Sequence, residues 1–141
     1  MNLTDWAEHC HALSRNAGWW DIPSHLTEKF EGYGVDSSKP IVRRMITPDQ
    51  WRDLVTPTKI SLIHSEVSEA MEGFRKGLND DHLPYRKMAE VELADALIRI
   101  FDLAGAWGYD LEAAVQEKLA YNQKRPDHQP DARAADGGKK F

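Results

Sequence analysis

Two acidic pairs with the same spacing lie inside segments whose apolar residues recur with a helical period. Glu66 pairs with Glu69, and Glu92 pairs with Asp95. An offset of three residues places both members of a pair on one helix face, about one turn apart. Two such helices packed side by side concentrate four negative charges, which is costly unless the charges are compensated. The sequence therefore predicts a helical core that carries a compensated acidic site.

Hard divalent cations with phosphate ligands are the obvious compensators of such a site, because carboxylate oxygens are ligands that Mg²⁺ accepts. This favours a Mg²⁺-dependent enzyme that acts on a phosphate ester or anhydride, with Mn²⁺ as a substitute metal. The structural alternative is a salt-bridge core in which Arg99, Lys118 and Arg125 neutralise the four acids. Salt-bridge cores add little stability relative to apolar packing, so two pairs on apolar-rich helices favour a functional site.

The pattern predicts an all-α fold, a helical bundle built on an αα-hairpin with flanking helices. Threonine or aspartate at N-cap positions, proline at first helical positions and glycine at helix ends delimit the segments. The expected helices run from Thr4 to about Gly18, Pro48 to about Val55, Pro57 to Gly77, Pro84 to about Ala104, and Asp110 to about Lys124.

The length of 141 residues suits one domain, which we expect to span residues 1–126. Within it, residues 19–46 break the helical pattern with prolines and glycines. We expect an ordered loop there, with a short helix around Ser24 to Glu31. The tail, residues 127–141, lacks periodicity, and we expect it to be mobile or ordered only against a partner subunit.

The second acid-bearing helix is apolar around more than half of its circumference, which predicts that it is largely buried. Its remaining narrow strip holds Glu92, Asp95, Arg99 and Asp102. A hairpin with so much apolar surface has more to bury than one chain easily covers. We therefore expect a homo-dimer or a homo-tetramer.

Basic and amide side chains gather on the last predicted helix, where Lys118, Asn122 and Arg125 share one face. Cations and an amide on this face suit phosphate oxygens outside a metal's coordination shell. Lys59, two turns before Glu66, is a weaker candidate for the same task.

Tryptophan residues follow the first predicted helix and recur in the short one. Trp20, with its neighbour Trp19 and with Trp51, either stacks on a nucleotide base or packs the irregular segment onto the bundle.

Composition narrows the classes of protein and the compartment. A formal net charge of −5 argues against a general nucleic-acid binder or an anionic-membrane binder. No apolar run approaches the roughly 20 residues of a membrane span, and the start of the chain lacks the pattern of a secretory signal. Cys10 is the single cysteine and has no internal disulfide partner, so we expect a cytoplasmic protein.

Together these motifs resemble the all-α nucleoside triphosphate pyrophosphohydrolases, specifically the MazG-like group. The runs that carry the resemblance are Lys59 to Ala70, Glu92 to Arg99 and Lys118 to Pro126. The similarity extends from Pro57 to about Pro126 and leaves residues 19–56 unexplained.

The resemblance implies a helical hairpin core that dimerises or tetramerises, with Mg²⁺ held by four catalytic carboxylates. These are Glu66, Glu69, Glu92 and Asp95. It also implies hydrolysis of a nucleoside triphosphate, deoxy or non-standard forms included, between the α and β phosphates, giving a monophosphate and pyrophosphate. Lys118 and Arg125 would hold the outer phosphates, with Asn122 on a phosphate or sugar oxygen.

One position departs from this group. Some relatives carry a further glutamate immediately before the first pair, where this chain has Ser65, so the general base stays unassigned. The sequence also leaves alternatives open. One is a nucleotide-specific relative, such as a dUTP or dCTP diphosphatase or a phosphoribosyl-ATP pyrophosphohydrolase. The other is a non-catalytic helical oligomer with a salt-bridged acidic core.

Overall fold

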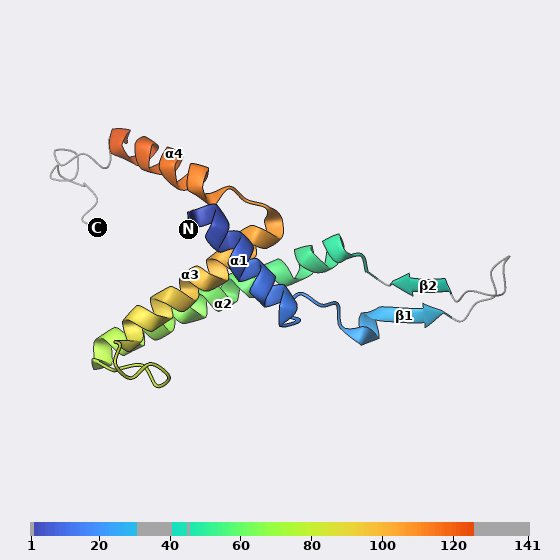
Figure 1. Cartoon of the computed structure of the whole chain (residues 1–141), viewed down its shortest axis with the longest axis horizontal. Coiled ribbons are helices and arrows are strands. Elements are labelled where there is room, and N and C mark those ends of the chain that lie inside the picture. Colours follow the sequence, from blue (N-terminus) through green and yellow to red (C-terminus); the bar gives the residue numbers. More distant parts are fainter. Residues whose placement is uncertain (1, 31–40, 45, 126–141) are drawn as a thin grey trace, which may run out of the picture.

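The computed structural model describes residues 2–30, 41–44 and 46–125, and within them the fold is dominated by α-helices (Figure 1). The helices are α1 (Leu3–Asn16), α2 (Pro48–Lys76), α3 (Met88–Trp107) and α4 (Leu111–Lys124). A 3₁₀ turn, η1 (Ser24–Leu26), leads into two antiparallel strands, β1 (Thr27–Phe30) and β2 (Ile41–Arg44). The predicted all-helical core is therefore confirmed, and the strand pair is an addition between α1 and α2.

Helices α2 and α3 pack along most of their length as an antiparallel hairpin (Figure 1). At its open end the Trp107 indole N–H donates to Thr56 Oγ1 over 3.0 Å. At its closed end a Cβ on Gly73 would lie only 2.8 Å from the Met88 side chain. Small residues at this contact let the two backbones approach closely, so side chains from both helices meet between them.

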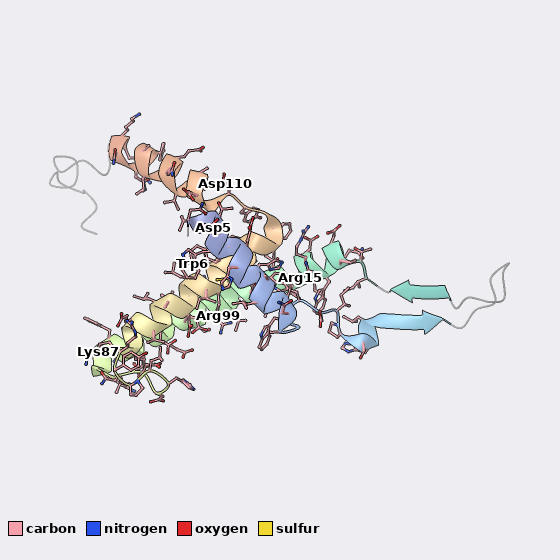
Figure 2. All side chains as sticks on the ribbon, viewed as in Figure 1. Asp5, Trp6, Arg15, Lys87, Arg99 and Asp110 are labelled. Carbon is pink, nitrogen blue, oxygen red and sulfur yellow. The ribbon has the colours of Figure 1, made fainter. Side chains whose placement is uncertain are left out.

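Helix α1 crosses α3, and the crossing depends on small residues. Ala7 and Cys10 of α1 are buried there, as is Ala104 of α3. Toward the beginning of α1, Trp6 stacks on Phe101 with ring centroids 6.4 Å apart. After Asp110, α4 runs away from the hairpin and makes its main contacts with α1 (Figures 1 and 2).

The predicted boundary within α2 is wrong, because one helix of 29 residues continues through Pro57. A proline inside a helix removes one backbone hydrogen bond and normally kinks or ends the helix. Here both sides of Pro57 are anchored on α3. Before Pro57, Arg52 donates to the Ala106 carbonyl over 3.4 Å, and after it, Lys59 Nζ donates to Asp102 Oδ2 over 3.1 Å. Tertiary packing thus overrides the local signal.

Three other predictions about the helices differ from the structure. The N-cap of α1 is Asn2, which forms a capping box with Asp5, rather than Thr4. Helix α3 begins at Met88 rather than Pro84, because the preceding loop is held by a backbone bond from Met88 N–H to the Leu78 carbonyl over 3.1 Å.

The third difference lies between α1 and α2. The expected helix around Ser24 is replaced by η1 and β1, whose pairing with β2 is a non-local interaction that local residue patterns do not reveal. Glu31, the expected end of that helix, lies outside the described residues.

Large apolar side chains on the hairpin point outward in the single chain. Phe74 is 82% exposed, and Val67 and Met71 of the same α2 stripe are also exposed. On α3, Leu93, Leu97 and Ile98 are exposed too. The prediction that α3 is largely buried is therefore wrong for one chain. Small residues occupy the helix–helix contact, and the bulky ones are left around its rim.

Gly105 offers a test of the crossing between α1 and α3. A Cβ at this position would lie 2.5 Å from the Ala7 carbonyl oxygen and 2.6 Å from His11 Cβ. Overpacking of this kind costs about 1–3 kcal/mol. We expect Gly105→Ala to lower the free energy of unfolding, measured by urea denaturation, although alanine is the better helix former. Unchanged or higher stability would show that α1 does not approach α3 this closely.

Candidate metal and ligand site

Carboxylates from α2 and α3 converge at the centre of the hairpin. Glu66 and Glu69 come from α2 and Glu92 from α3, and one ligand oxygen from each lies within 4.8 Å of the others. Glu66 is 6% exposed and Glu92 is 8% exposed, whereas Glu69 is open to solvent. The structure therefore brings together three of the four predicted acids, two of them buried and one accessible.

Asp95 lies beside this group without being part of the 4.8 Å cluster. Its pKa is raised, first by burial and then by the negative charge of Glu66, and the Arg99 guanidinium partly offsets that rise. The fourth predicted acid thus interacts electrostatically with the cluster without belonging to it.

Glu92 is the acid of this cluster whose pKa is most strongly raised. Burial, a shared hydrogen bond with Glu66 and the charges of Glu69, Glu66 and Asp95 raise its pKa to about 7. The cluster therefore holds a proton under conditions in which isolated glutamates are ionised. A group of carboxylates in this state has a strong electrostatic preference for an added cation.

The donor set fits a hard divalent cation. All three groups are carboxylates, which suit Mg²⁺ and Mn²⁺. An octahedral Mg²⁺ with bonds of about 2.1 Å holds its ligand atoms about 3–4 Å apart. Ligand atoms within 4.8 Å of one another therefore need only small side-chain adjustments to close around such an ion.

One cation from the chain already contacts the cluster. Arg99 Nε lies 2.6 Å from Glu66 Oε1, near the middle of α3 (Figure 2). Of the three cations expected in a salt-bridge core, Arg99 is thus in place. Lys118 forms no ion pair with the four acids within the described chain, and its ammonium lies 4.7 Å from the Tyr121 ring centroid instead.

A second polar centre lies on the same strip of α3, at Asp102. This buried carboxylate accepts hydrogen bonds from Ser14 Oγ over 2.9 Å and from Trp20 Nε1 over 2.8 Å. It also contacts Lys59 Nζ at 3.1 Å and His11 Nδ1 at 3.0 Å. We call these five residues the Asp102 hub; it ties α1, the segment after it and α2 to α3.

Lys59 and Trp20, both predicted to bind substrate, meet at this hub rather than at the acids. The Lys59 ammonium lies 4.4 Å from the centroid of the Trp20 ring. Seven residues separate Lys59 from Glu66 on α2, and seven separate Asp95 from Asp102 on α3. Two helical turns span about 10 Å, so the hub and the acid cluster lie on one strip of the hairpin.

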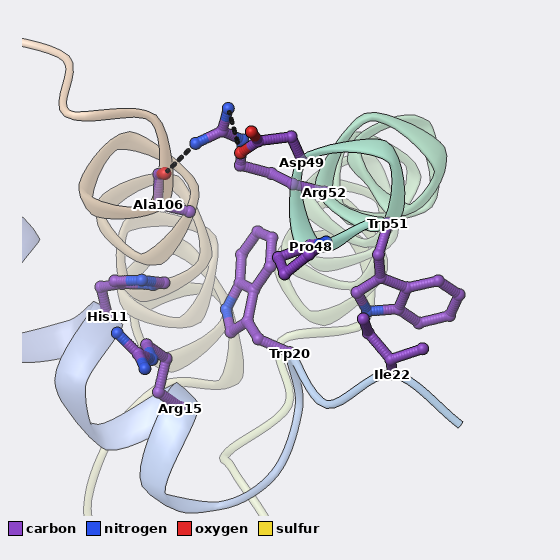
Figure 3. A pocket seen from close by; sticks show the side chains of 9 residues that line it. All are labelled: His11, Arg15, Trp20, Ile22, Pro48, Asp49, Trp51, Arg52 and Ala106. Atoms are coloured by element: carbon purple, nitrogen blue, oxygen red, sulfur yellow. Dashed lines mark hydrogen bonds and ion pairs between the residues drawn. The ribbon is translucent and has the colours of Figure 1, made fainter. Parts of the chain in front are cut away.

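Next to the hub is a cavity of about 270 Å³ between α1, α2 and α3 (Figure 3). Its lining includes His11, Arg15, Trp20, Pro48, Trp51 and Arg52. The Trp51 Nε1 and Arg52 Nε groups are buried without a hydrogen-bond partner among the residues that the structure places. The aromatic faces of Trp20 and Trp51 in this lining suit a planar ligand.

Most of this cavity was not predicted from the sequence. The sequence predicts Trp20 and Trp51 as candidates for stacking, but its local spacing does not place His11, Arg15 or Arg52 at a binding site. These residues converge only because α1 crosses α3 near the beginning of α2, and no local spacing encodes that crossing.

The predicted basic face of α4 is not brought to the acids of the same chain, since α4 packs mainly on α1. Lys118 and Asn122 make no ion pair or hydrogen bond with the four carboxylates in the part of the chain that is described. Asn122 Oδ1 is buried and receives no hydrogen bond within that part. Arg125, at the C-cap of α4, has its guanidinium 6.0 Å from the Tyr121 ring centroid.

No protein-family model matches the chain, and the searches of curated proteins and of solved structures gave no match. None of the described helices combines the length and the apolar character needed to cross a membrane.

The raised pKa of Glu92 predicts a pH-dependent cost in the metal-free protein. Between pH 4.5 and about 7 the folded state holds a proton that the unfolded state has released, so stability falls as the pH rises through this window. We expect Glu92→Gln to raise the melting temperature at pH 8 by a few degrees and to have little effect near pH 4.5. Glu117→Gln, at an exposed position of α4, serves as the control. A Glu92→Gln variant no more stable than the wild type at pH 8 would contradict the electrostatic account of the cluster.

Removing the carboxylate of the Asp102 hub should be strongly destabilising. Asp102→Ala leaves the Lys59 ammonium, which is mostly buried, without its ion-pair partner and the Trp20 N–H without its acceptor. Breaking a buried pair from one side costs about 3–5 kcal/mol. Asp102→Asn keeps the shape and one acceptor oxygen, so its loss in urea denaturation should be clearly smaller. If both variants lost the same small amount of free energy of unfolding, the hub would not be among the interactions that hold α1 on the hairpin.

Proposed function

We propose that the protein is a Mg²⁺-dependent nucleoside triphosphate pyrophosphohydrolase of the MazG-like group, with Mn²⁺ as a substitute metal. It would cut nucleoside triphosphates, deoxy or non-standard forms included, between the α and β phosphates. The observation that carries the proposal is the meeting of Glu66, Glu69 and Glu92 from two helices within 4.8 Å. The free, buried Cys10 agrees with action in a reducing cytoplasm.

The reaction requires little covalent chemistry from the protein. A water oxygen attacks the α-phosphorus, the bond to the bridging oxygen of the β-phosphate breaks, and pyrophosphate leaves with that oxygen. Bound Mg²⁺ would supply charge neutralisation and a more acidic water. Glu66, Glu69 and Glu92 would hold and orient the cation. Ser65 donates to the Leu62 carbonyl over 2.8 Å, so its hydroxyl is engaged by the backbone and the general base stays unassigned.

The arrangement of the strip supports a substrate position. With phosphates at the acid cluster, a nucleotide extends about 10 Å along the hairpin before reaching the Asp102 hub. The cavity beside the hub then takes the base, with Trp20 as one wall. The Lys59 ammonium lies at the hub, where its charge favours the phosphate and sugar groups that approach the cavity. The proposal thus keeps Trp20 and Lys59 as substrate-binding residues.

A homo-dimer or homo-tetramer forms part of the proposal. The exposed apolar side chains of α2 and α3 need cover, and a second copy of the chain supplies apolar surface of the same kind. Because α4 projects from its own hairpin, it can reach the hairpin of a neighbour (Figure 1). Lys118, Asn122 and Arg125 would then bind phosphate or sugar oxygens held at the partner's acids. Asn122 Oδ1, which has no partner among the described residues, would accept a hydrogen bond from a sugar hydroxyl.

A second candidate is a non-catalytic helical oligomer with a salt-bridged acidic core, and the short contact between Arg99 and Glu66 favours it. The two candidates differ in their response to metal, because a bound ion stabilises the folded state by mass action. A melting temperature indifferent to millimolar Mg²⁺ would favour the non-catalytic candidate. The nucleotide-specific alternatives are the dUTP, dCTP and phosphoribosyl-ATP enzymes. They differ from the proposed enzyme only in the triphosphate that is hydrolysed.

The central test is product release from a panel of nucleoside triphosphates with and without Mg²⁺. We expect monophosphate and pyrophosphate in equal amounts from the wild type, only with the metal. Glu66→Gln and Asp95→Asn should each lower kcat at least 100-fold, an order-of-magnitude figure for losing charge at the reacting phosphate, while the helical circular dichroism signal is retained.

Glu72→Gln is the matched control, because Glu72 lies on α2 and pairs only with Arg75 and Lys76 in the described chain. Its kcat should equal that of the wild type. Full activity in either Glu66→Gln or Asp95→Asn would remove the metal hypothesis, and orthophosphate as the product would exclude cleavage at the α–β bond.

A further inference from the structure

We propose that Arg99 is a transferable counter-ion: it neutralises Glu66 in the ligand-free protein and moves to the phosphates of a bound polyphosphate when a divalent cation takes its place. The inference rests on the proposed function, since it assumes that the acid cluster receives a cation. It adds a phosphate-binding residue to that site.

The two side chains of the ion pair between Arg99 and Glu66 differ in their exposure to solvent. The Arg99 side chain is 41% exposed, whereas that of Glu66 is buried. Only Nε of the guanidinium is engaged, and Arg99 makes no other ion pair or hydrogen bond with the residues that the structure places. Its two terminal amino groups therefore keep their donors, in a fork geometry that matches phosphate oxygens.

The position of Arg99 suits such a transfer. It lies one turn beyond Asp95 and one turn before Asp102 on α3, between the acid cluster and the hub. A polyphosphate that extends from the acids toward the cavity passes this side chain. An exposed guanidinium at that point can turn from Glu66 to the phosphates without a change in the backbone.

Electrostatics give the direction of the movement. A divalent cation bound to Glu66 repels the neighbouring guanidinium and takes up the charge of the carboxylate that held it. A polyphosphate brings negative charge in excess of the metal, so it attracts the released guanidinium. Binding of the metal–polyphosphate complex therefore replaces one ion pair by another rather than leaving Arg99 unpaired.

The competing explanation is that Arg99 stays on Glu66 and orients it as a metal ligand, a common role for groups that hydrogen-bond a ligating carboxylate. The two explanations predict opposite signs for the cation alone. A counter-ion competes with the metal, so its removal tightens metal binding. An orienting partner supports the metal, so its removal weakens binding.

The experiment is calorimetric titration of the full-length protein with Mn²⁺ alone, and then with inorganic tripolyphosphate at saturating Mn²⁺. Tripolyphosphate probes the phosphate site without a base. We expect Arg99→Met to bind Mn²⁺ about two- to fivefold more tightly, the range for a partly exposed ion pair. We expect it to bind tripolyphosphate about tenfold more weakly, since charge-assisted hydrogen bonds are lost.

Two further variants keep the test decisive. Arg99→Lys retains charge without the fork and should change both affinities in the same directions by less; it decides the outcome if Arg99→Met does not fold. Arg75→Met, which removes an exposed arginine of α2, should leave both affinities unchanged.

Weaker Mn²⁺ binding, or unchanged tripolyphosphate binding, in the Arg99 variants would overturn the inference and leave the proposed function intact. A wild-type protein that binds neither probe would overturn both.

Discussion

The antiparallel contact between α2 and α3 is the constraint on which the rest of the structure depends. Ala70 and Gly73 on α2 and Ala96 on α3 are buried, and their small size lets the two helices approach closely. Close approach brings Glu66 and Glu92 into one buried space, where like charges repel. The packing that stabilises the hairpin thus also forces negative charges close together. Their repulsion gives the site its preference for a cation.

Buried negative charge is compensated at two places along one strip of the hairpin. At the acid cluster, a proton on Glu92 and the guanidinium of Arg99 offset part of the negative charge. At the hub, Asp102 is satisfied by donors from three segments of the chain. The hub is complete within the chain and holds α1 in place, whereas the acid cluster is only partly satisfied. A buried site that is left partly satisfied is where a ligand contributes most.

The sequence predicted those parts of the fold and the site that depend on local spacing. The helical pattern and the N-cap of α4 at Asp110 follow from residue patterns that a single chain segment carries. The convergence of Glu66 with Glu92 requires in addition that the two helices pack as a hairpin, which their apolar patterns predict. The continuation of α2 through Pro57 and the pairing of β1 with β2 depend on contacts between distant segments. Residue spacing does not contain that information.

The site shows the same division. Pairs such as Glu66 and Glu69 could be predicted because three residues on a helix fix their relation. The partnership of Trp20 and Lys59 through Asp102 could not, because it requires α1 to cross α3 at Gly105. The exposure of the apolar stripe on α2 could not be predicted either. Periodicity shows that Val67 and Phe74 share one side of the helix, but not whether a neighbouring helix covers that side.

The most direct test of the central claim, that the converging carboxylates bind a divalent cation, is anomalous X-ray diffraction from crystals of the protein grown with Mn²⁺. The account predicts an anomalous peak between α2 and α3, bonded to oxygens of Glu66, Glu69 and Glu92. Crystals at millimolar Mn²⁺ with no peak at these residues, and with Arg99 still on Glu66, would contradict it.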